Sequence, residues 1–311
     1  MFGRKAREIN KSSAFARRAP TWNSLAASFR PPTMSDRIAK LRRAYAAEVA
    51  RRGGVLDPRI EEAFAAVPRE DFSGPPPWFV GSGGFGWTPH SDPARLYDDV
   101  LVAIDKGRGI NNGQPSLHAQ CIDALAPKGG ETVVQIGAGA GYYSAILARL
   151  VGPTGKIFAY EIETDIAERA RANLAGRAQV EVRARSAVGE DLPTADCIYA
   201  SCAASHPVRG WLDAMNVGGR LLFPLQAAHS TGAMLLIARP EKGEAWPARF
   251  LGGVVFIACD GAQEAKMGRR LDDAFARGGS RRVRSLIFGA KPSRSDWLRG
   301  DGWVLSFEEA G

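Results

Sequence analysis

Residues 132–150 have the sequence TVVQIGAGAGYYSAILARL, which joins an apolar run to three alternating glycines and a segment of helical character. The pattern predicts a strand over 132–136 and a helix over 143–150, connected by a glycine turn. Open α/β sheets bind nucleotide-like ligands at such a turn. We therefore interpret Gly137, Gly139 and Gly141 as a binding loop and not as a plain turn.

Short apolar runs and amphipathic segments alternate along the rest of the chain. The expected strands are 156–160, 180–182, 197–200, 221–223, 234–238 and 250–258, the last two as a hairpin-like pair. The expected helices are 35–66 (two helices, split at residues 52–54), 115–126, 164–174 and 208–215. Strands that alternate with helices of this length predict an α/β fold with a doubly wound, mostly parallel, Rossmann-like sheet.

The remaining segments frame this core. Residues 73–95 are rich in Gly, Pro, Ser and Trp, and we expect a long functional or mobile loop there. Residues 269–311 are expected to add a basic helix and two strands, as a C-terminal α+β extension. The predicted division of the chain is 1–33 (basic, disordered leader), 34–127 (N-terminal helices and acceptor-side loop), 128–265 (cofactor-binding core) and 266–311 (C-terminal extension).

The net charge of +8 is concentrated in the leader. Residues 1–33 contribute +6 of it, so the remaining 278 residues carry only +2. These residues are nearly neutral, whereas a protein that binds a nucleic-acid backbone carries a concentrated positive charge. In addition, no apolar run has the length of about 20 residues that a membrane helix needs. We expect neither a nucleic-acid nor a membrane partner. The four cysteines form no CxxC pair, which favours free thiols in a reducing compartment and a cytoplasmic location.

Glu161 ends the second predicted strand, 24 residues after Gly137. An acid at this position accepts hydrogen bonds from ribose hydroxyls in doubly wound folds. Tyr142 stands where a dinucleotide fingerprint has its third glycine, and the Gly-Lys-Ser/Thr ending of a P-loop is absent. A nucleoside ligand without a pyrophosphate is therefore predicted, and S-adenosyl-L-methionine fits this description.

At this point the chain resembles the protein-L-isoaspartate O-methyltransferases, over roughly residues 55 to 262. The matching stretches occur in the order of that family. They are Asp57-Pro58-Arg59, Val67-Pro68-Arg69-Glu70-Asp71-Phe72, Tyr97-Asp98, the segment 113–119 (GQPSLHA), the segment 196–204 (DCIYASCAA), the segment 218–224 (GGRLLFP) and Arg249-Phe250. The glycine motif is common to many methyltransferases, whereas the Pro-Arg and Gln-Pro segments and their order are specific.

The resemblance implies two sets of site residues. The cofactor set is Gln135, Gly137, Ala138, Gly139, Gly141, Tyr142, Glu161, Ile162, Ser186 and Ala187. On the acceptor side it implies Asn112 and Gly113 at the catalytic position, with Asn111 and Gln114 as substrate-binding neighbours. Two positions depart from the family pattern. Gly113 replaces a serine that contacts the acceptor carboxylate, and segment 185–189 lacks the usual acid after strand three.

The resemblance implies an S-adenosylmethionine-dependent O-methyltransferase that methylates a carboxylate, with an isoaspartyl residue of damaged protein or peptide as the first candidate and protein repair as the role. A different acceptor (a peptide natural product or a small acid) and an impaired cofactor-binding protein are the alternatives. A carboxylate is already ionised at neutral pH, so this chemistry requires neither a general base nor a metal. Asn112, or Asn111, is expected to replace the serine as donor. His118 is interpreted as a packing or capping residue in preference to an acceptor contact. We expect a monomer.

Overall fold

The strand-turn-helix unit that the glycine sequence predicts is present, as β5 (Thr132–Ile136) followed by α4 (Tyr142–Val151). The computed structural model describes residues 33–81, 86–189 and 191–310. The predicted leader therefore lies outside the described residues, apart from Thr33.

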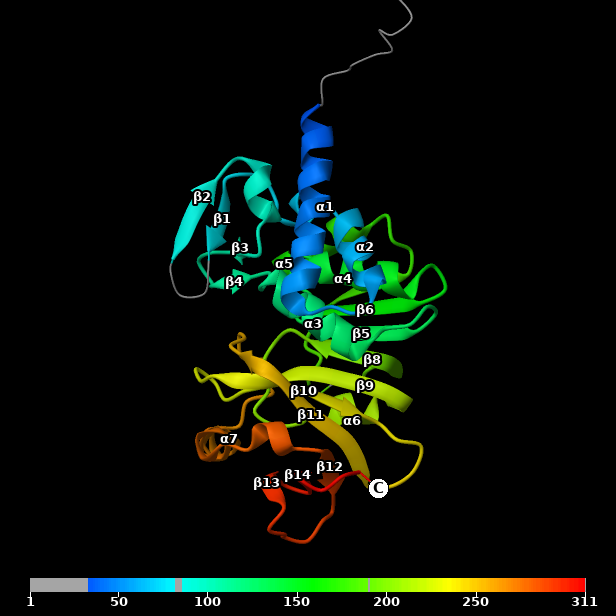
Figure 1. Cartoon of the computed structure of the whole chain (residues 1–311), viewed down its shortest axis with the longest axis vertical. Coiled ribbons are helices and arrows are strands. Elements are labelled where there is room, and N and C mark those ends of the chain that lie inside the picture. The colour runs from blue at the N-terminus through cyan, green and yellow to red at the C-terminus, as the bar shows by residue number, and fades with distance from the viewer. Residues whose placement is uncertain (1–32, 82–85, 190, 311) are drawn as a thin grey trace, which may run out of the picture.

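One long sheet runs through the described chain (Figure 1). Its other strands are β6 (Lys156–Glu161), β7 (Val180–Ala184), β8 (Ala195–Ala200), β9 (Met215–Leu225), β10 (Gly232–Ala238), β11 (Ala245–Val254), β12 (Ser285–Phe288), β13 (Asp296–Arg299) and β14 (Trp303–Ser306). Their order is β13-β14-β12-β11-β10-β9-β8-β5-β6-β7. The pairs from β9 to β7 are parallel, and those from β9 to β13 are antiparallel. The predicted doubly wound α/β core is thus confirmed.

The C-terminal segment continues this sheet. β10 and β11 pair antiparallel, as the predicted hairpin requires. Residues 269–311 contribute three strands where two were predicted, because β13, β14 and β12 pair with one another and β12 pairs with β11. Helix α7 (Ala265–Arg277) packs its apolar side against the same part of the sheet through Met267, Leu271 and Ala274.

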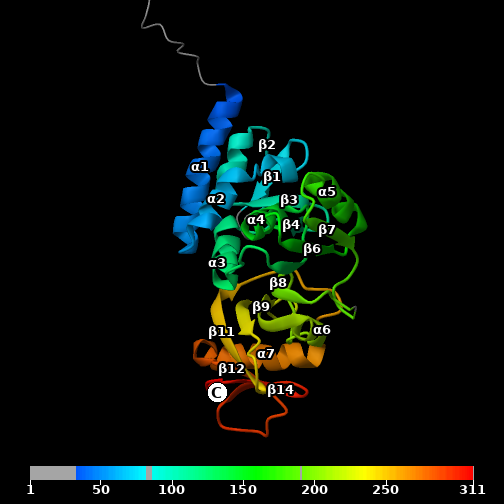
Figure 2. The ribbon, with the colours of Figure 1, turned by 90° about the vertical axis from the view of Figure 1, so that its right-hand side faces the viewer.

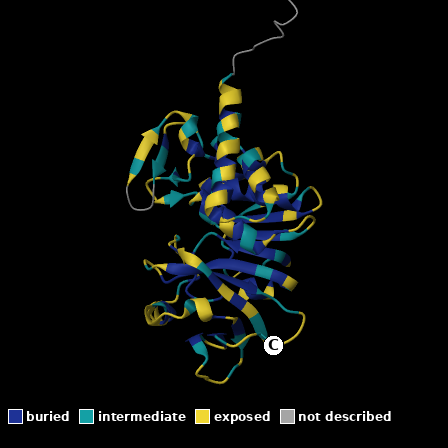
Figure 3. Cartoon of the chain, viewed as in Figure 1, coloured by how far each residue is buried: buried dark blue, intermediate teal, exposed yellow. Residues whose placement is uncertain are grey.

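Both faces of the central sheet are buried, and alternate residues of each strand supply the two faces. Val133 belongs to one apolar cluster and the next residue, Val134, to the other. The first cluster is covered by α1 (Met34–Gly53), α2 (Pro58–Ala66), α3 (Pro115–Leu125), α4 and α5 (Thr164–Leu174). The second is covered by α6 (Arg209–Asp213) and α7. Figure 2 shows α1, α2 and α3 side by side, and Figure 3 shows that buried residues concentrate in the sheet.

The two N-terminal helices begin at residues that cap them, and the first begins one residue before the predicted range. Asp57 caps α2 and Pro58 occupies its first turn. Helix α1 begins at Met34, because Thr33 and Asp36 form a capping box in which the Thr33 hydroxyl accepts from the Asp36 N–H at 3.1 Å. None of the helices in the described ranges is both long and apolar enough to cross a lipid bilayer.

Residues 73–95 are not a long loop, and that prediction was wrong. They contain β1 (Trp78–Gly81), β2 (Trp87–His90) and part of a short 3-10 helix, η3 (Pro93–Tyr97). Together with β3 (Leu101–Asp105) and β4 (Ile110–Asn111) they form a second sheet, in the order β2-β1-β3-β4, beside α1 (Figure 1). A further 3-10 helix, η2, spans Glu70–Phe72, and another, η4, spans Ser280–Arg282. Trp78 is buried against Leu96 and Val102, so it packs a small core of its own.

Candidate functional site

The glycine loop has a backbone that only glycine adopts without strain. Gly137, Gly139 and Gly141 have φ angles of 74°, 56° and 92°. A Cβ atom on Gly139 would lie 2.8 Å from Cδ1 of Ile104, and one on Gly141 would lie 2.7 Å from Cδ1 of Leu174. The alternating glycines therefore let the backbone of the loop run close to its neighbours.

Glu161 is tied directly to this loop. Its Oε2 accepts from the backbone N–H of Gly139 at 2.8 Å, and its Oε1 accepts from the N–H of Glu163 at 3.1 Å. Burial raises the pKa of the Glu161 carboxyl above its ordinary value, and these two N–H groups oppose the rise. A carboxylate oxygen has room for more than one donor, so each oxygen can still accept a hydroxyl. Ile162, beside it, is 45% exposed.

A cavity of about 540 Å³ opens next to the loop. It is bounded by segments that are far apart in the chain: residues 137–140 with Tyr142 and Tyr143, residues 111–114 with Leu117 and His118, residues 99–101 with Ile104, residues 253–257, and Phe72, Gly81 and Ser201. The sequence-predicted cofactor loop and the whole predicted acceptor segment, Asn111 to Gln114, thus face one space.

The predicted cofactor residues outside 137–142 do not line this cavity, and neither does Gly141. Gln135 is fully buried beneath the loop and accepts from the Ser144 hydroxyl at 2.6 Å. The Ser186 hydroxyl accepts from the Val188 N–H at 3.0 Å, and Ala187 is buried, with its carbonyl accepting from the indole of Trp211 at 2.9 Å. Gly141 caps the N-terminus of α4.

Arg69 is a fully buried cation behind the acceptor segment. Its guanidinium donates to the carbonyls of Leu96 (2.7 Å), Asp98 (3.1 Å) and Val100 (2.6 Å) and to Oδ1 of Asn112 (3.2 Å). All of these partners are neutral, and within the described residues no salt bridge joins Arg69 to a carboxylate. A buried charge that is solvated only by carbonyls favours an anion in the adjoining cavity.

The two asparagines of the acceptor segment hold the segment in shape. Oδ1 of Asn112 accepts from the Val102 N–H at 2.9 Å as well as from Arg69, so its amide nitrogen is the end that remains to donate. Oδ1 of Asn111 accepts from the Gly113 N–H at 2.9 Å. Gly113 has a φ of 67°, and a Cβ there would lie 2.2 Å from Nε2 of His118. No side chain fits at position 113 with His118 in place.

Asp99 also lines the cavity, but its carboxylate is engaged at the start of α3. It accepts from the backbone N–H and the hydroxyl of Ser116, at 2.8 and 2.6 Å, and from the side-chain amide of Gln114 at 2.9 Å. The amide of Gln114, a predicted substrate-binding group, is therefore directed to Asp99. The N-terminus of a helix stabilises an anion at this place.

An apolar rim completes the mouth of the cavity. Val255 and Ile257 are 71% and 49% exposed, although both line the cavity. Gln226 fixes the segment between them, because its side chain accepts from the Phe256 N–H at 2.8 Å and donates to the Phe256 carbonyl at 3.0 Å. An exposed apolar edge of this kind suits a peptide more than an isolated small anion.

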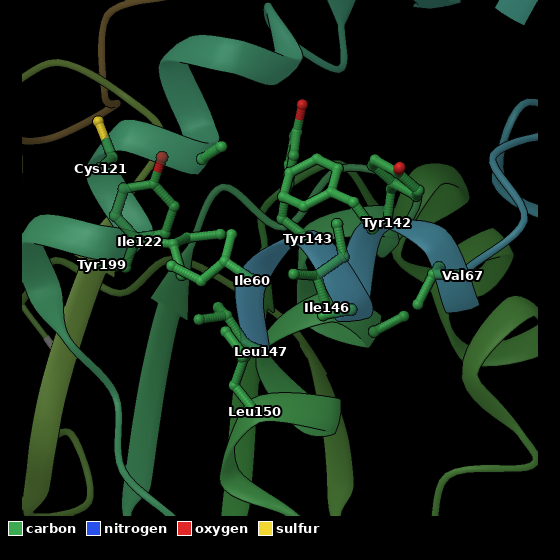
Figure 4. Close-up of a cluster of buried hydrophobic side chains, with 14 of the residues drawn as sticks. Ile60, Val67, Cys121, Ile122, Tyr142, Tyr143, Ile146, Leu147, Leu150 and Tyr199 are labelled. Atoms are coloured by element: carbon green, nitrogen blue, oxygen red, sulfur yellow. The ribbon is translucent and has the colours of Figure 1, made fainter. Parts of the chain in front are cut away.

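Sequence reasoning missed several of these groups. Arg69, Asp98 and Ser201 belonged to motifs that carried the resemblance but received no role. Residues 253–257 were predicted only as part of a strand, and Asp99 carries no local signal. The hydroxyls of Tyr143 and Ser201 are buried without a hydrogen-bond partner among the described residues, and both line the cavity. Figure 4 shows Tyr142 and Tyr143 of α4 in the buried cluster that also holds Tyr199. Among the described residues, no group of three or more His, Cys, Asp or Glu side chains is arranged to hold a metal ion.

Comparison with known proteins agrees with this geometry. A family model described as protein-L-isoaspartate(D-aspartate) O-methyltransferase matches residues 42–263. A protein-L-isoaspartate O-methyltransferase 1 of Rhodopseudomonas palustris is 32% identical over 216 residues, which are 67% of this chain and 80% of the relative. One from Aeropyrum pernix is 33% identical over 211 residues, 64% of this chain and 72% of the relative.

A solved structure supports the fold. A Plasmodium falciparum structure of the same class, in complex with S-adenosyl-L-homocysteine, matches with a TM-score of 0.56 and 18% sequence identity, over 70% of this chain and 98% of that one. At this identity the likeness concerns the fold.

Proposed function

The chain belongs to the protein-L-isoaspartate O-methyltransferase family, and we infer from this membership and from the cavity that it is an S-adenosylmethionine-dependent enzyme that methylates isoaspartyl carboxylates in proteins. The observation that carries the inference is that the glycine loop, to which Glu161 is hydrogen-bonded, and the segment 111–114 border a single cavity. Neither half alone would bring a methyl donor and an acceptor together.

The residues present fit the cofactor. The positive φ angles at Gly137 and Gly139 keep side chains out of a backbone cradle, and Glu161 offers free acceptor positions at its edge. We propose that residues 137–139 contact the methionyl part, and that Glu161 accepts from the ribose hydroxyls beside Ile162. Ser186 and Ala187 are proposed to lie against the adenine side.

The reaction needs little from the protein beyond placement. Bound S-adenosylmethionine supplies a methyl group on a sulfonium, which a carboxylate lone pair attacks in line to give a methyl ester and S-adenosylhomocysteine without proton transfer. The protein contributes alignment and exclusion of water. The buried charge of Arg69 draws the acceptor carboxylate into the cavity, while its hydrogen bonds to carbonyls keep the guanidinium off the attacking oxygen.

We assign the acceptor side to Asn111, Asn112, Gly113 and Gln114. Asn112 is the member with a free amide donor, and Asn111 and Gln114 shape the segment through bonds to Gly113 and Asp99. We also propose a role in protein repair in the cytoplasm, as a monomer. The free state of the described cysteines, Cys121, Cys197, Cys202 and Cys259, fits a reducing compartment.

Methyl transfer to a matched pair of peptides tests the function. The purified full chain is incubated with labelled S-adenosylmethionine and either an isoaspartyl peptide or the same peptide with ordinary aspartate. We expect a base-labile methyl ester on the isoaspartyl peptide alone. Transfer to small acids but to neither peptide would support a different acceptor. Binding of S-adenosylhomocysteine without any transfer would support an impaired cofactor-binding protein.

A further inference from the structure

The imidazole of His118 turns one nitrogen, Nε2, toward the cavity, through the space that a side chain at position 113 would fill. Nε2 lies 2.2 Å from the place of a Cβ on Gly113, and both residues line the cavity. The described part of the chain gives Nε2 no hydrogen-bond partner. Nε2 can therefore reach the cavity only because residue 113 is a glycine and has no Cβ.

The ring is held rigidly by its surroundings. It stacks on Tyr143 with ring centroids 3.7 Å apart and an interplanar angle of 10°. The rings of Tyr199 and Phe256 meet it edge-on, at 5.9 and 6.0 Å. Its other nitrogen, Nδ1, lies 2.7 Å from the hydroxyl of Tyr199. Because the ring is held in one orientation, Nε2 points in one direction. The imidazole therefore loses little conformational entropy when a ligand binds to it.

The contact with Tyr199 favours one of the two nitrogens as the site of the ring proton. The hydroxyl of Tyr199 needs an acceptor for its hydrogen. Its other neighbours are the sulfur of Cys121, which accepts weakly, and the hydroxyl of Ser201, which has no hydrogen-bond partner among the described residues. Donation from Tyr199 to Nδ1 leaves the proton of a neutral imidazole on Nε2, facing the cavity. Burial and the charge of Arg69 lower the pKa of His118 to about 3, so the ring is neutral at the pH of a cell.

We propose that His118 is an acceptor-binding residue whose Nε2–H donates to the acceptor carboxylate, and that Tyr199 is the positioning residue that keeps the proton on Nε2. The proposal rests on the proposed function. The hydrogen bond goes to the carboxylate oxygen that does not attack, so the lone pair of the other oxygen remains free. No proton changes place during the transfer. A neutral donor also avoids the repulsion that an imidazolium would exert on a sulfonium.

The test compares two substitutions that differ in the donor. His118→Leu removes it, whereas His118→Gln keeps an N–H at a distance along the side chain similar to that of Nε2. We expect kcat/KM for the isoaspartyl peptide to fall about 10- to 100-fold in His118→Leu, the effect of losing a hydrogen bond to a charged group, mainly through KM. His118→Gln should recover at least half of the loss on a logarithmic scale. Affinity for S-adenosylhomocysteine, measured by calorimetry, should change less than twofold in both.

Two further variants separate positioning from packing. Tyr199→Phe retains the aromatic ring and loses the hydroxyl, so we expect about a threefold rise in KM. Ile122→Val, on the same helix but away from the cavity, serves as the packing control. It should lower the melting temperature by about 2–4 °C and leave KM unchanged. An increase in KM in Ile122→Val equal to that in Tyr199→Phe would mean that KM reports packing, and would overturn the positioning role.

Nitrogen NMR of the wild-type ring keeps the proposal testable if His118→Leu does not fold. The ¹⁵N spectrum should show the neutral Nε2–H form, and the Nε2 signal should move when the isoaspartyl peptide is added to the protein saturated with S-adenosylhomocysteine. An Nδ1–H form, an unmoved Nε2 signal, or an unchanged KM in folded His118→Leu would each overturn the proposal. A wild-type protein that methylates no isoaspartyl peptide would instead overturn the proposed function.

Discussion

The carboxylate of Glu161 and the backbone N–H of Gly139 are joined by a hydrogen bond of 2.8 Å. The acid at the tip of β6 and the middle glycine of the loop are therefore one unit, although 22 positions separate them. Because of this bond, a change in the conformation of the loop would move the Glu161 carboxylate and so change its contact with a bound ligand.

Substitution of Glu161 by alanine should weaken binding of S-adenosylhomocysteine by about 1.5–3 kcal/mol, because a charge-assisted acceptor is lost and the Gly139 N–H is released. Calorimetry on the full chain measures the change. The control is Glu163→Ala, which removes an exposed carboxylate that pairs with Arg108 and leaves the loop bonds intact. Equal affinities of wild type and Glu161→Ala would remove Glu161 from the cofactor site.

The stability of the protein should depend on pH through His118. Its pKa in the folded protein is about 3, against an ordinary value of 6.5, so the unfolded chain binds more protons in the interval between these values. The free energy of unfolding should therefore fall as pH decreases from 6.5 toward 3, by up to about 1.4 kcal/mol per pH unit from this residue. His118→Gln should lose that contribution.

The measurement is urea unfolding of wild type and His118→Gln between pH 4.5 and 7.5. His206 also has a lowered pKa through burial, and it contributes equally to both proteins, so the difference between them isolates His118. Parallel pH profiles would show that the imidazole takes up its proton at the same pH in the folded protein as in the unfolded chain, against its burial between Tyr143, Tyr199 and Phe256.

The part of the fold that the sequence predicted well is the part with local signals. The strand 132–136 and the helix 164–174 have the observed bounds, because burial on both faces and a clear helical period mark them. The sheet formed by residues 78–111 was missed. Its strands are two to five residues long, and β1 pairs with β3 across more than 15 residues, so nothing local marks them as strands.

The candidate site shows the same division. The spacing between Gly137 and Glu161 is typical of nucleoside-binding α/β folds. The binding loop could therefore be predicted from the sequence. The relationship of Gly113 to His118 depends on a φ angle and on the entry of α3, which place two residues five positions apart in contact. Arg69 lies more than 40 positions from Asn112, and only the folded chain brings them together.

Asn112→Ala should lower transfer and stability together. It removes the potential amide donor to the acceptor, and it leaves the Val102 N–H and one Arg69 N–H without their acceptor, a loss of about 1–3 kcal/mol. Asn111→Ala releases the Gly113 N–H and a long bond of 3.4 Å to the Gly109 carbonyl, and it should have a smaller effect on the melting temperature. Cofactor affinity should be nearly unchanged in both. Full transfer activity in the double variant would remove this segment from the acceptor site.

Gly113→Ser should abolish most transfer and should not increase it. Position 113 has a positive φ, and its Cβ would meet Nε2 of His118, so the new side chain must push the imidazole off Tyr143. Gly109→Ser is the matched control, because Gly109, in the turn before β4, has a φ of 72° but nothing within 4 Å of its Cβ. The control should lose about 1–2 kcal/mol of stability from backbone strain alone.

Gly113→Ser should lose roughly 1–3 kcal/mol more from overpacking, and its KM for the isoaspartyl peptide should rise while that of Gly109→Ser stays at the wild-type value. Both quantities follow from thermal unfolding and steady-state kinetics of the two variants. A Gly113→Ser protein as stable as Gly109→Ser, with undiminished transfer, would mean that the imidazole can leave its place without harm to acceptor binding.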